Sequence, residues 1–133
     1  MDNPDNAPAG KHPGGNPLAG RSVLVTEDEP YLAEELADYL TALGMVVVGP
    51  FPSTQRALIG IEGRRLDCAV LDINLNGETS YSIAELLADR EVPFLFMSGY
   101  SRDILPARFS SQPMVKKPMY PGELRAVMTT MLA

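Results

Sequence analysis

The chain has 133 residues, a formal net charge of −6 and a pI of about 4.7. Such an acidic balance argues against nucleic acid or an anionic membrane as the main partner. The length suits one domain with a real core. The sequence has no apolar run long enough to span a membrane and no secretory apolar segment near Met1. We therefore expect a cytoplasmic protein.

The first twenty residues are rich in proline and glycine, and Leu18 is their only large apolar residue after the initial methionine. A segment of this composition cannot bury enough apolar surface to order itself. We predict a flexible tail over residues 1–20 and one domain over residues 21–133.

The domain alternates short apolar runs with segments of helical periodicity. Strands are predicted at 22–26, 45–50, 68–71, 93–97 and 113–116. Helical segments are predicted at 30–43, 53–62, 78–90, 102–108 and 121–132.

Several single residues support these boundaries. Pro30 suits the first position of a helix, where the acid Glu29 would also complement the helix dipole. Ser53 is a typical N-cap. Pro50 favours an edge position for the second strand, and Pro106 interrupts the fourth helical segment.

This alternation predicts an α/β fold: right-handed crossovers, a parallel sheet and helices on both faces. With the second strand at an edge, the arrangement fits a flavodoxin-like, doubly wound, five-stranded parallel sheet of order 2-1-3-4-5. In such sheets ligands bind beyond the carboxyl ends of the strands.

Chemically active side chains follow four of the five strands. They are Glu27, Asp28, Asp72, Ser98 and Lys117. A single acid after a strand is commonly a helix cap or a turn former. The predicted strand order, however, brings the three acids into one crevice, with the serine and the lysine at its rim.

Three acids in one crevice repel one another unless a cation is present, and Mg²⁺ prefers such carboxylates together with waters and a phosphate oxygen. A carboxylate can also act as a nucleophile and form an aspartyl phosphate. Lys117, Ser98 and nearby backbone N–H groups would then neutralise and position the transferring oxygens.

Four motifs carry a family resemblance: Val25-Thr26-Glu27-Asp28-Glu29-Pro30, Val70-Leu71-Asp72-Ile73-Asn74-Leu75, Phe96-Met97-Ser98-Gly99-Tyr100 and Val115-Lys116-Lys117-Pro118. With them, residues 21–133 resemble the CheY-like receiver domains of two-component response regulators. The resemblance implies that Asp72 is the phosphoacceptor. It also implies that Glu27 and Asp28 are the acidic pair, with Asp28 the direct Mg²⁺ ligand.

The resemblance assigns three further roles. The backbone carbonyl of Asn74 would complete the metal site. Ser98 would occupy the position at which the family has Ser or Thr. Lys117 would pair with the phosphate, because the family lysine directly precedes a proline, usually in a cis peptide bond. Lys116 is the competitor for that role.

One position departs from the common pattern. Many receivers have Tyr or Phe three residues before that lysine, whereas this chain has Met114. The segment 96–100 instead resembles the FAT GUY receivers, a single-domain subgroup that lacks this aromatic residue. Without that aromatic side chain, we expect the signal to pass through the segment 99–111, as a poorly formed or mobile fourth helix. Its few large apolar residues, Tyr100, Ile104, Leu105 and Phe109, should give it only limited packing.

The implied function is that of a single-domain regulator, since nothing after Ala133 can form an output domain. It would take a phosphoryl group from a sensor histidine kinase or a histidine phosphotransfer protein, and then change partner binding or pass the group on. It would assist its own phosphorylation and dephosphorylation without being an enzyme. A downstream partner or a second copy would dock on the fourth helix, the fifth strand and the last helix.

Three alternatives compete with this interpretation. A haloacid-dehalogenase-like phosphohydrolase needs a second acid two residues after the nucleophile, where this chain has Asn74. A flavin mononucleotide binder would carry a phosphate loop after the first strand, where this chain has acids. A phosphorylation-independent pseudo-receiver would be expected to lack some of the site residues.

Overall fold

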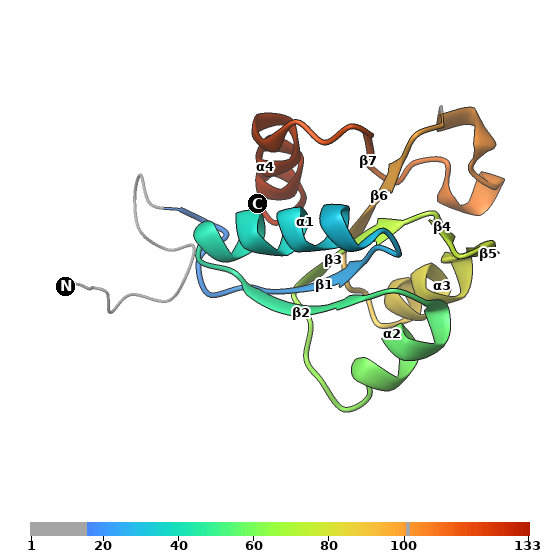
Figure 1. Cartoon of the computed structure of the whole chain (residues 1–133), viewed down its shortest axis with the longest axis horizontal. Helices are drawn as coiled ribbons and strands as arrows, with labels where there is room; N and C mark the ends of the chain where they lie inside the picture. The colour runs from blue at the N-terminus through green and yellow to red at the C-terminus, as the bar shows by residue number, and fades with distance from the viewer. Residues whose placement is uncertain (1–15, 101) are drawn as a thin grey trace.

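In a computed structural model of the protein, residues 16–100 and 102–133 are described. Five parallel strands form one sheet in the order β2-β1-β3-β6-β7 (Figure 1). The strands are β1 (Ser22–Thr26), β2 (Val46–Phe51), β3 (Cys68–Asp72), β6 (Phe94–Ser98) and β7 (Met114–Lys116). This is the predicted 2-1-3-4-5 order, with β3 at the centre and the proline-containing β2 at an edge.

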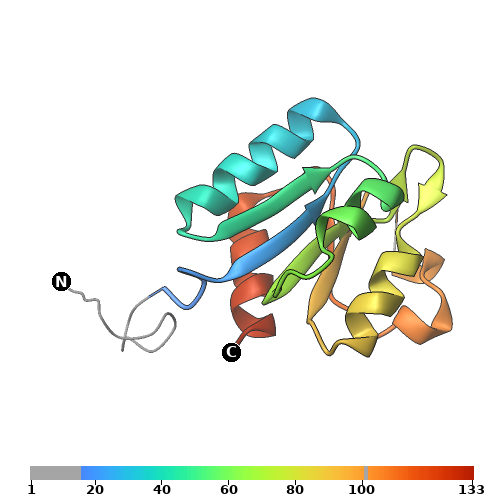
Figure 2. The same cartoon turned by 90° about the horizontal axis from the view of Figure 1, so that it is seen from below.

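Helices cover both faces of the sheet (Figures 1 and 2). They are α1 (Pro30–Ala42), α2 (Thr54–Gly60), α3 (Tyr81–Asp89) and α4 (Pro121–Met131). Successive strand residues point to opposite faces, so Leu95 packs in the cluster with α1 and α4, while Phe94 and Phe96 pack in the cluster with α2 and α3. Within the described residues, no helix combines the length and apolar character needed to cross a membrane.

The helix boundaries confirm the capping residues expected from the sequence. Pro30 begins α1, and the Glu29 carboxylate accepts the N–H groups of Tyr31 and Leu32 at 3.3 and 2.9 Å. The Ser53 hydroxyl accepts the N–H of Arg56 at 3.2 Å at the start of α2. Satisfying these unpaired N–H groups stabilises each helix start.

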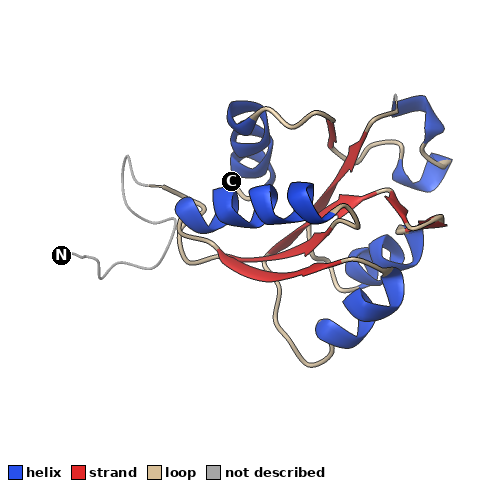
Figure 3. Cartoon of the chain, viewed as in Figure 1, coloured by secondary structure: helices blue, strands red, loops and turns tan. Residues whose placement is uncertain are grey.

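The predicted fourth helix is absent from this part of the chain and is replaced by two short 3₁₀ turns, η1 (Arg102–Ile104) and η2 (Ala107–Phe109) (Figure 3). Pro106 separates them, because it has no N–H to donate and its ring would clash within a continuous helix. The expectation of poor helix formation is thus confirmed. The expectation of limited packing is wrong for Leu105 and Phe109, which are only 8% and 3% exposed.

The predicted third helix begins later than expected, at Tyr81 rather than residue 78. The preceding residues form a two-stranded hairpin of β4 (Asn74–Leu75) and β5 (Glu78–Thr79). Asn76 and Gly77 make its turn with φ values of 54° and 86°. Both residue types tolerate this left-handed conformation, so the Asn-Gly pair favours a tight hairpin here.

Residues 16–20 differ from the tail predicted over 1–20, whose residues 1–15 lie outside the described part. Leu18 is completely buried in the cluster with α1 and α4. The Asn16 amide donates to the carbonyl of Leu43 at 2.7 Å, and the Gly20 N–H donates to the carbonyl of Gly44 at 2.8 Å. Residues 16–20 therefore belong to the packed domain.

Candidate functional site

The predicted site residues meet at the carboxyl-terminal edge of the sheet. Asp72 and Ser98 are the last residues of β3 and β6. Glu27 and Asp28 follow β1, and Lys117 follows β7. The parallel sheet brings these ends together from positions far apart in the sequence.

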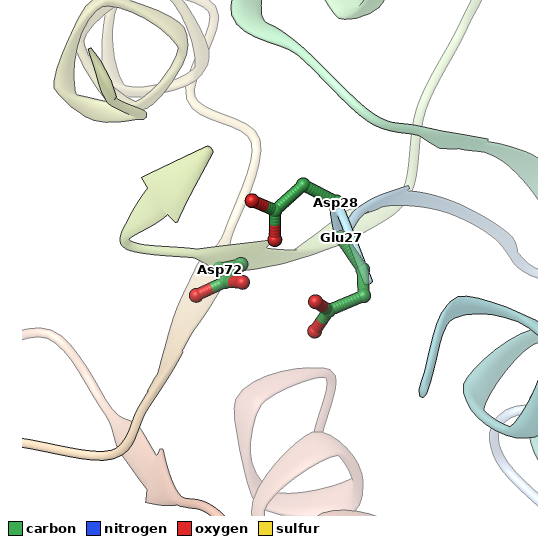
Figure 4. Close-up of side chains that lie close together, drawn as sticks. All are labelled: Glu27, Asp28 and Asp72. Carbon is green, nitrogen blue, oxygen red and sulfur yellow. The ribbon is translucent and has the colours of Figure 1, made fainter. Parts of the chain in front are cut away.

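Three carboxylates converge in this crevice (Figure 4). One oxygen from each of Glu27, Asp28 and Asp72 lies within 4.8 Å of the others. Glu27 is 4% exposed and Asp72 is 6% exposed, whereas Asp28 is half-buried. This concentration of buried negative charge requires compensation by a cation.

Lys117 supplies part of that compensation. Its ammonium nitrogen lies 2.8 Å from Glu27 Oε1 and 2.9 Å from Asp72 Oδ2. Lys116 is exposed, as expected for the neighbouring residue of a strand end. The Lys117–Pro118 peptide bond is cis, in agreement with the family pattern.

The ion pairs determine the protonation of the lysine. Burial lowers the pKa of Lys117, but hydrogen bonds to Glu27 and Asp72 outweigh this effect and hold the pKa above its ordinary value. Burial raises the pKa of Glu27, and the hydrogen bond from Lys117 opposes that rise. Lys117 is therefore an ammonium at neutral pH.

Backbone and hydroxyl groups hold the acids in place. Thr26 Oγ1 accepts the N–H of Asp72 at 3.1 Å, and Glu27 Oε2 accepts the N–H of Glu29 at 3.1 Å. Asp28 Oδ2 accepts the N–H of Asn76 at 2.8 Å. Backbone N–H groups thus orient the carboxylates of Glu27 and Asp28, and the Thr26 hydroxyl fixes the backbone of Asp72.

A cleft of about 320 Å³ opens over Asp72. Its lining residues are Asp28, Asp72, Asn74, Gly77, Ser98, Gly99, Tyr100 and Lys117. Ser98 is 3% exposed, and its hydroxyl oxygen accepts the N–H of Tyr100 at 2.9 Å. A tetrahedral anion in this cleft would meet the Lys117 ammonium, the Ser98 hydroxyl and the Asp72 carboxylate.

The donor set fits Mg²⁺. Carboxylate oxygens are the hard ligands that this ion selects, and Asp28 and Asp72 both line the cleft. Asn74 also lines it, and its side-chain oxygen accepts the N–H of Gly77 at 2.9 Å, so the amide side chain is used within the hairpin. Asp28, Asp72 and the Asn74 carbonyl would hold the ion, with Glu27 adding negative charge.

Sequence reasoning did not single out two residues that shape this site, Thr26 and Asn76. The Asn76–Gly77 pair is a recognised hairpin signal and could have revealed the β4–β5 turn. Nothing local marks the Thr26 hydroxyl as a partner of Asp72, because that contact joins residues 46 positions apart.

The comparisons agree with this geometry. Residues 23–129 match the response regulator receiver domain family, and the chain belongs to that family. It is therefore a two-component signal-transduction protein of the CheY-like receiver class.

The chain is also similar in sequence to an individual response regulator. The chain is 30% identical over 114 residues to the phyllosphere-induced regulator PhyR of Methylorubrum extorquens, covering 83% of this chain and 43% of that protein. It thus spans less than half of that relative.

Among solved structures, SdrG from Sphingomonas melonis Fr1 has a TM-score of 0.75 and 36% identity, with 86% of this chain and 98% of that chain covered. PhyR from Brucella abortus has a TM-score of 0.72 and 25% identity, over 86% of this chain and 49% of that one. The resemblance to the FAT GUY subgroup stays a prediction.

Proposed function

We propose that Asp72 accepts a phosphoryl group from a phosphohistidine, and that the chain then changes its partner binding or passes the group on. The observation that carries this proposal is the position of Asp72, at the end of the central strand with the Lys117 ammonium 2.9 Å away. A carboxylate held beside a fixed cation in a cleft suits phosphoryl transfer, which depends on positioning and charge neutralisation.

In the proposed step, a carboxylate oxygen of Asp72 forms a bond to phosphorus while the phosphorus–nitrogen bond of the phosphohistidine breaks. The imidazole leaves with the electron pair of that bond. Lys117 and the Ser98 hydroxyl stabilise the charge on the phosphoryl oxygens. When bound, Mg²⁺ would supply further neutralisation of those oxygens.

The relatives support a phosphorylation-linked conformational response. SdrG, at 36% identity and a TM-score of 0.73, has also been solved in a BeF3-activated conformation. In this chain, Tyr100 N–H donates to the Ser98 hydroxyl. If that hydroxyl turns toward a phosphoryl group, the Tyr100 amide loses its acceptor and the segment after β6 must adjust.

The segment after β6 is part of the surface to which we propose that a downstream partner binds. Tyr100 and Ile104 are 63% and 42% exposed, and they follow β6, the strand that pairs with β7. Since the predicted fourth helix is two 3₁₀ turns, this docking surface consists of η1, η2, β7 and α4. A downstream protein or a second copy of the chain would bind there.

Incubation with acetyl phosphate and Mg²⁺, followed by intact mass measurement, tests the proposal. The wild-type protein should gain one phosphoryl group, and Asp72→Asn should gain none. Asp89→Asn, at an exposed acid near the end of α3, is the matched control and should be labelled normally. Equal labelling of Asp72→Asn would refute the assignment.

Two further outcomes separate the alternatives. Full labelling in excess EDTA would contradict the requirement for Mg²⁺. A wild-type protein that is never labelled, but still binds its partner, would be a phosphorylation-independent binding module.

A further inference from the structure

We propose that Asn76 is a positioning residue for the metal site, acting through its backbone N–H on Asp28. The β4–β5 hairpin would thereby set the affinity of the site for a divalent cation. This inference rests on the metal requirement in the proposed function and adds the residue that orients one ligand.

Asp28 differs from the other two acids in its partners. Lys117 bridges Glu27 and Asp72 at 2.8 and 2.9 Å. Asp28 is half-buried, and the hydrogen bond from Asn76 N–H at 2.8 Å is the contact that holds its carboxylate among the described residues. Without this bond, repulsion from the neighbouring acids would favour rotation of Asp28 toward solvent.

The hairpin fixes the direction of this N–H. The left-handed Asn76 and Gly77 form the turn, and Gly77 N–H donates to Asn74 Oδ1 at 2.9 Å. Asn76 Nδ2 donates to the carbonyl of Pro52 at 3.2 Å, which joins the turn to the segment before α2. The N–H of Asn76 is therefore held by the turn itself and by a contact outside it.

Two backbone N–H groups of the hairpin reach the acids. Asn74 lies in β4, and Asn76 lies in the turn that follows it. The first approaches Asp72 Oδ1 at 3.4 Å, and the second binds Asp28 Oδ2 at 2.8 Å. The β4–β5 hairpin thus presents backbone donors to both carboxylates that line the cleft.

A donor held in this way should raise metal affinity. It holds Asp28 Oδ2 and so orders the carboxylate before the ion arrives, which lowers the entropic cost of metal binding. Removal of a group that orients a metal ligand typically weakens metal binding by about 10- to 100-fold.

Binding of Mn²⁺, followed by electron paramagnetic resonance with Mg²⁺ as competitor, tests the inference. Asn76→Pro removes the N–H and should weaken binding by about tenfold or more. Asn76→Gly keeps the N–H and tolerates a positive φ, but loses the contact with Pro52; it should bind within about twofold of wild type. Thermal melting of each variant establishes that it is folded.

Thr54→Val is the matched control for the hairpin as a whole. Thr54 Oγ1 donates to the carbonyl of Thr79 at 3.4 Å, so the variant removes a second hairpin contact without touching Asp28. It should bind Mn²⁺ like wild type. Equal weakening by Thr54→Val and Asn76→Pro would overturn the inference, as would wild-type affinity in Asn76→Pro.

A backbone ester at residue 76 separates the missing donor from any distortion by proline. The single cysteine, Cys68, allows ligation of a synthetic segment 68–133 that carries the ester. This protein should show the weakened Mn²⁺ binding of Asn76→Pro, and wild-type affinity would overturn the inference. Asp28→Ala should lose binding; if it binds like wild type, the metal site of the proposed function fails, whatever Asn76 does.

Discussion

At the scale of single residues, the site depends on one lysine shared by two acids. Lys117 lies within hydrogen-bonding distance of both Glu27 and Asp72, and burial raises the pKa of Glu27. A buried carboxylate that loses its cation must be protonated or solvated. Lys117 therefore stabilises the fold and prepares the cleft for an anion.

Replacement of this lysine should affect both properties. Lys117→Ala should lower the free energy of unfolding by about 1–3 kcal/mol and strongly reduce labelling by acetyl phosphate. Lys116→Ala, at the exposed neighbouring residue, is the control and should do neither. Impaired labelling in Lys116→Ala alone would show that the assignment of the two lysines is reversed.

Cys68 is a buried thiol in the central strand. Burial raises the pKa of this thiol from 9.0 to about 12. The unfolded chain therefore releases the thiol proton at lower pH than the folded chain does. Folding stability from this group is fully present below pH 9.0 and is lost as the pH rises toward about 12.

Urea unfolding of wild type and Cys68→Ala between pH 8 and 11 (about the accessible range) checks this sign. Above pH 9, the wild-type free energy of unfolding should fall more steeply, by up to about 1.4 kcal/mol per pH unit. All other ionisable groups are the same in the two proteins, so the difference isolates the thiol. Parallel curves would contradict the raised pKa.

At the scale of elements, the segment after β6 divides into two parts. Its start is exposed at Tyr100 and Ile104, but its end is anchored by Phe109. The Phe109 ring lies 5.5–6.1 Å from the rings of Tyr81, Phe94 and Phe96, measured between centroids. We therefore expect adjustment near Tyr100 and rigidity near Phe109.

Hydrogen exchange on the free and beryllofluoride-bound forms tests this division. The amides of Phe109 and Ser110, which donate to the carbonyls of Pro106 and Ala107, should exchange slowly in both forms. The Tyr100 amide should change its protection. Equal protection of Tyr100 in both forms would exclude this route for the signal.

Substitutions at the two ends of this segment should differ in their effect on the free energy of unfolding. Phe109→Ala should lower the free energy of unfolding by about 3–5 kcal/mol, because it empties the aromatic cluster. Ile104→Ala, at a residue that is 42% exposed, should change it by no more than about 0.5 kcal/mol. Similar losses in the two variants, measured by urea unfolding, would contradict the anchoring role of Phe109.

At the scale of the whole molecule, two apolar layers hold the sheet between two pairs of helices (Figure 2). Leu18 completes the layer under α1 and α4 from outside the region of regular secondary structure. The packed domain thus begins before β1.

Leu18→Ala should lower the free energy of unfolding by about 2–5 kcal/mol, since the leucine side chain is completely buried. Ile59→Ala, on the exposed side of α2 at 66% exposure, is the control and should have little effect. A neutral Leu18→Ala would mean that residues 16–20 do not pack on the domain in solution.

The sequence by itself determined the order of the strands, the helix caps and the meeting of Glu27, Asp28 and Asp72. These features depend on local periodicity, on capping residues such as Ser53, and on the rule that parallel strands end at one edge. The caps can be predicted from a short stretch of residues, whereas the strand order and the meeting of the acids follow from the alternation of elements along the domain.

Only the tertiary structure decided how the acids are paired and oriented. Lys117 reaches Glu27 and Asp72 across 90 and 45 positions, and Asn76 N–H reaches Asp28 across 48. The burial of Leu18 and Phe109 depends in the same way on distant partners. Such contacts leave no periodic pattern in the sequence, because they exist only once the sheet has brought separate segments together.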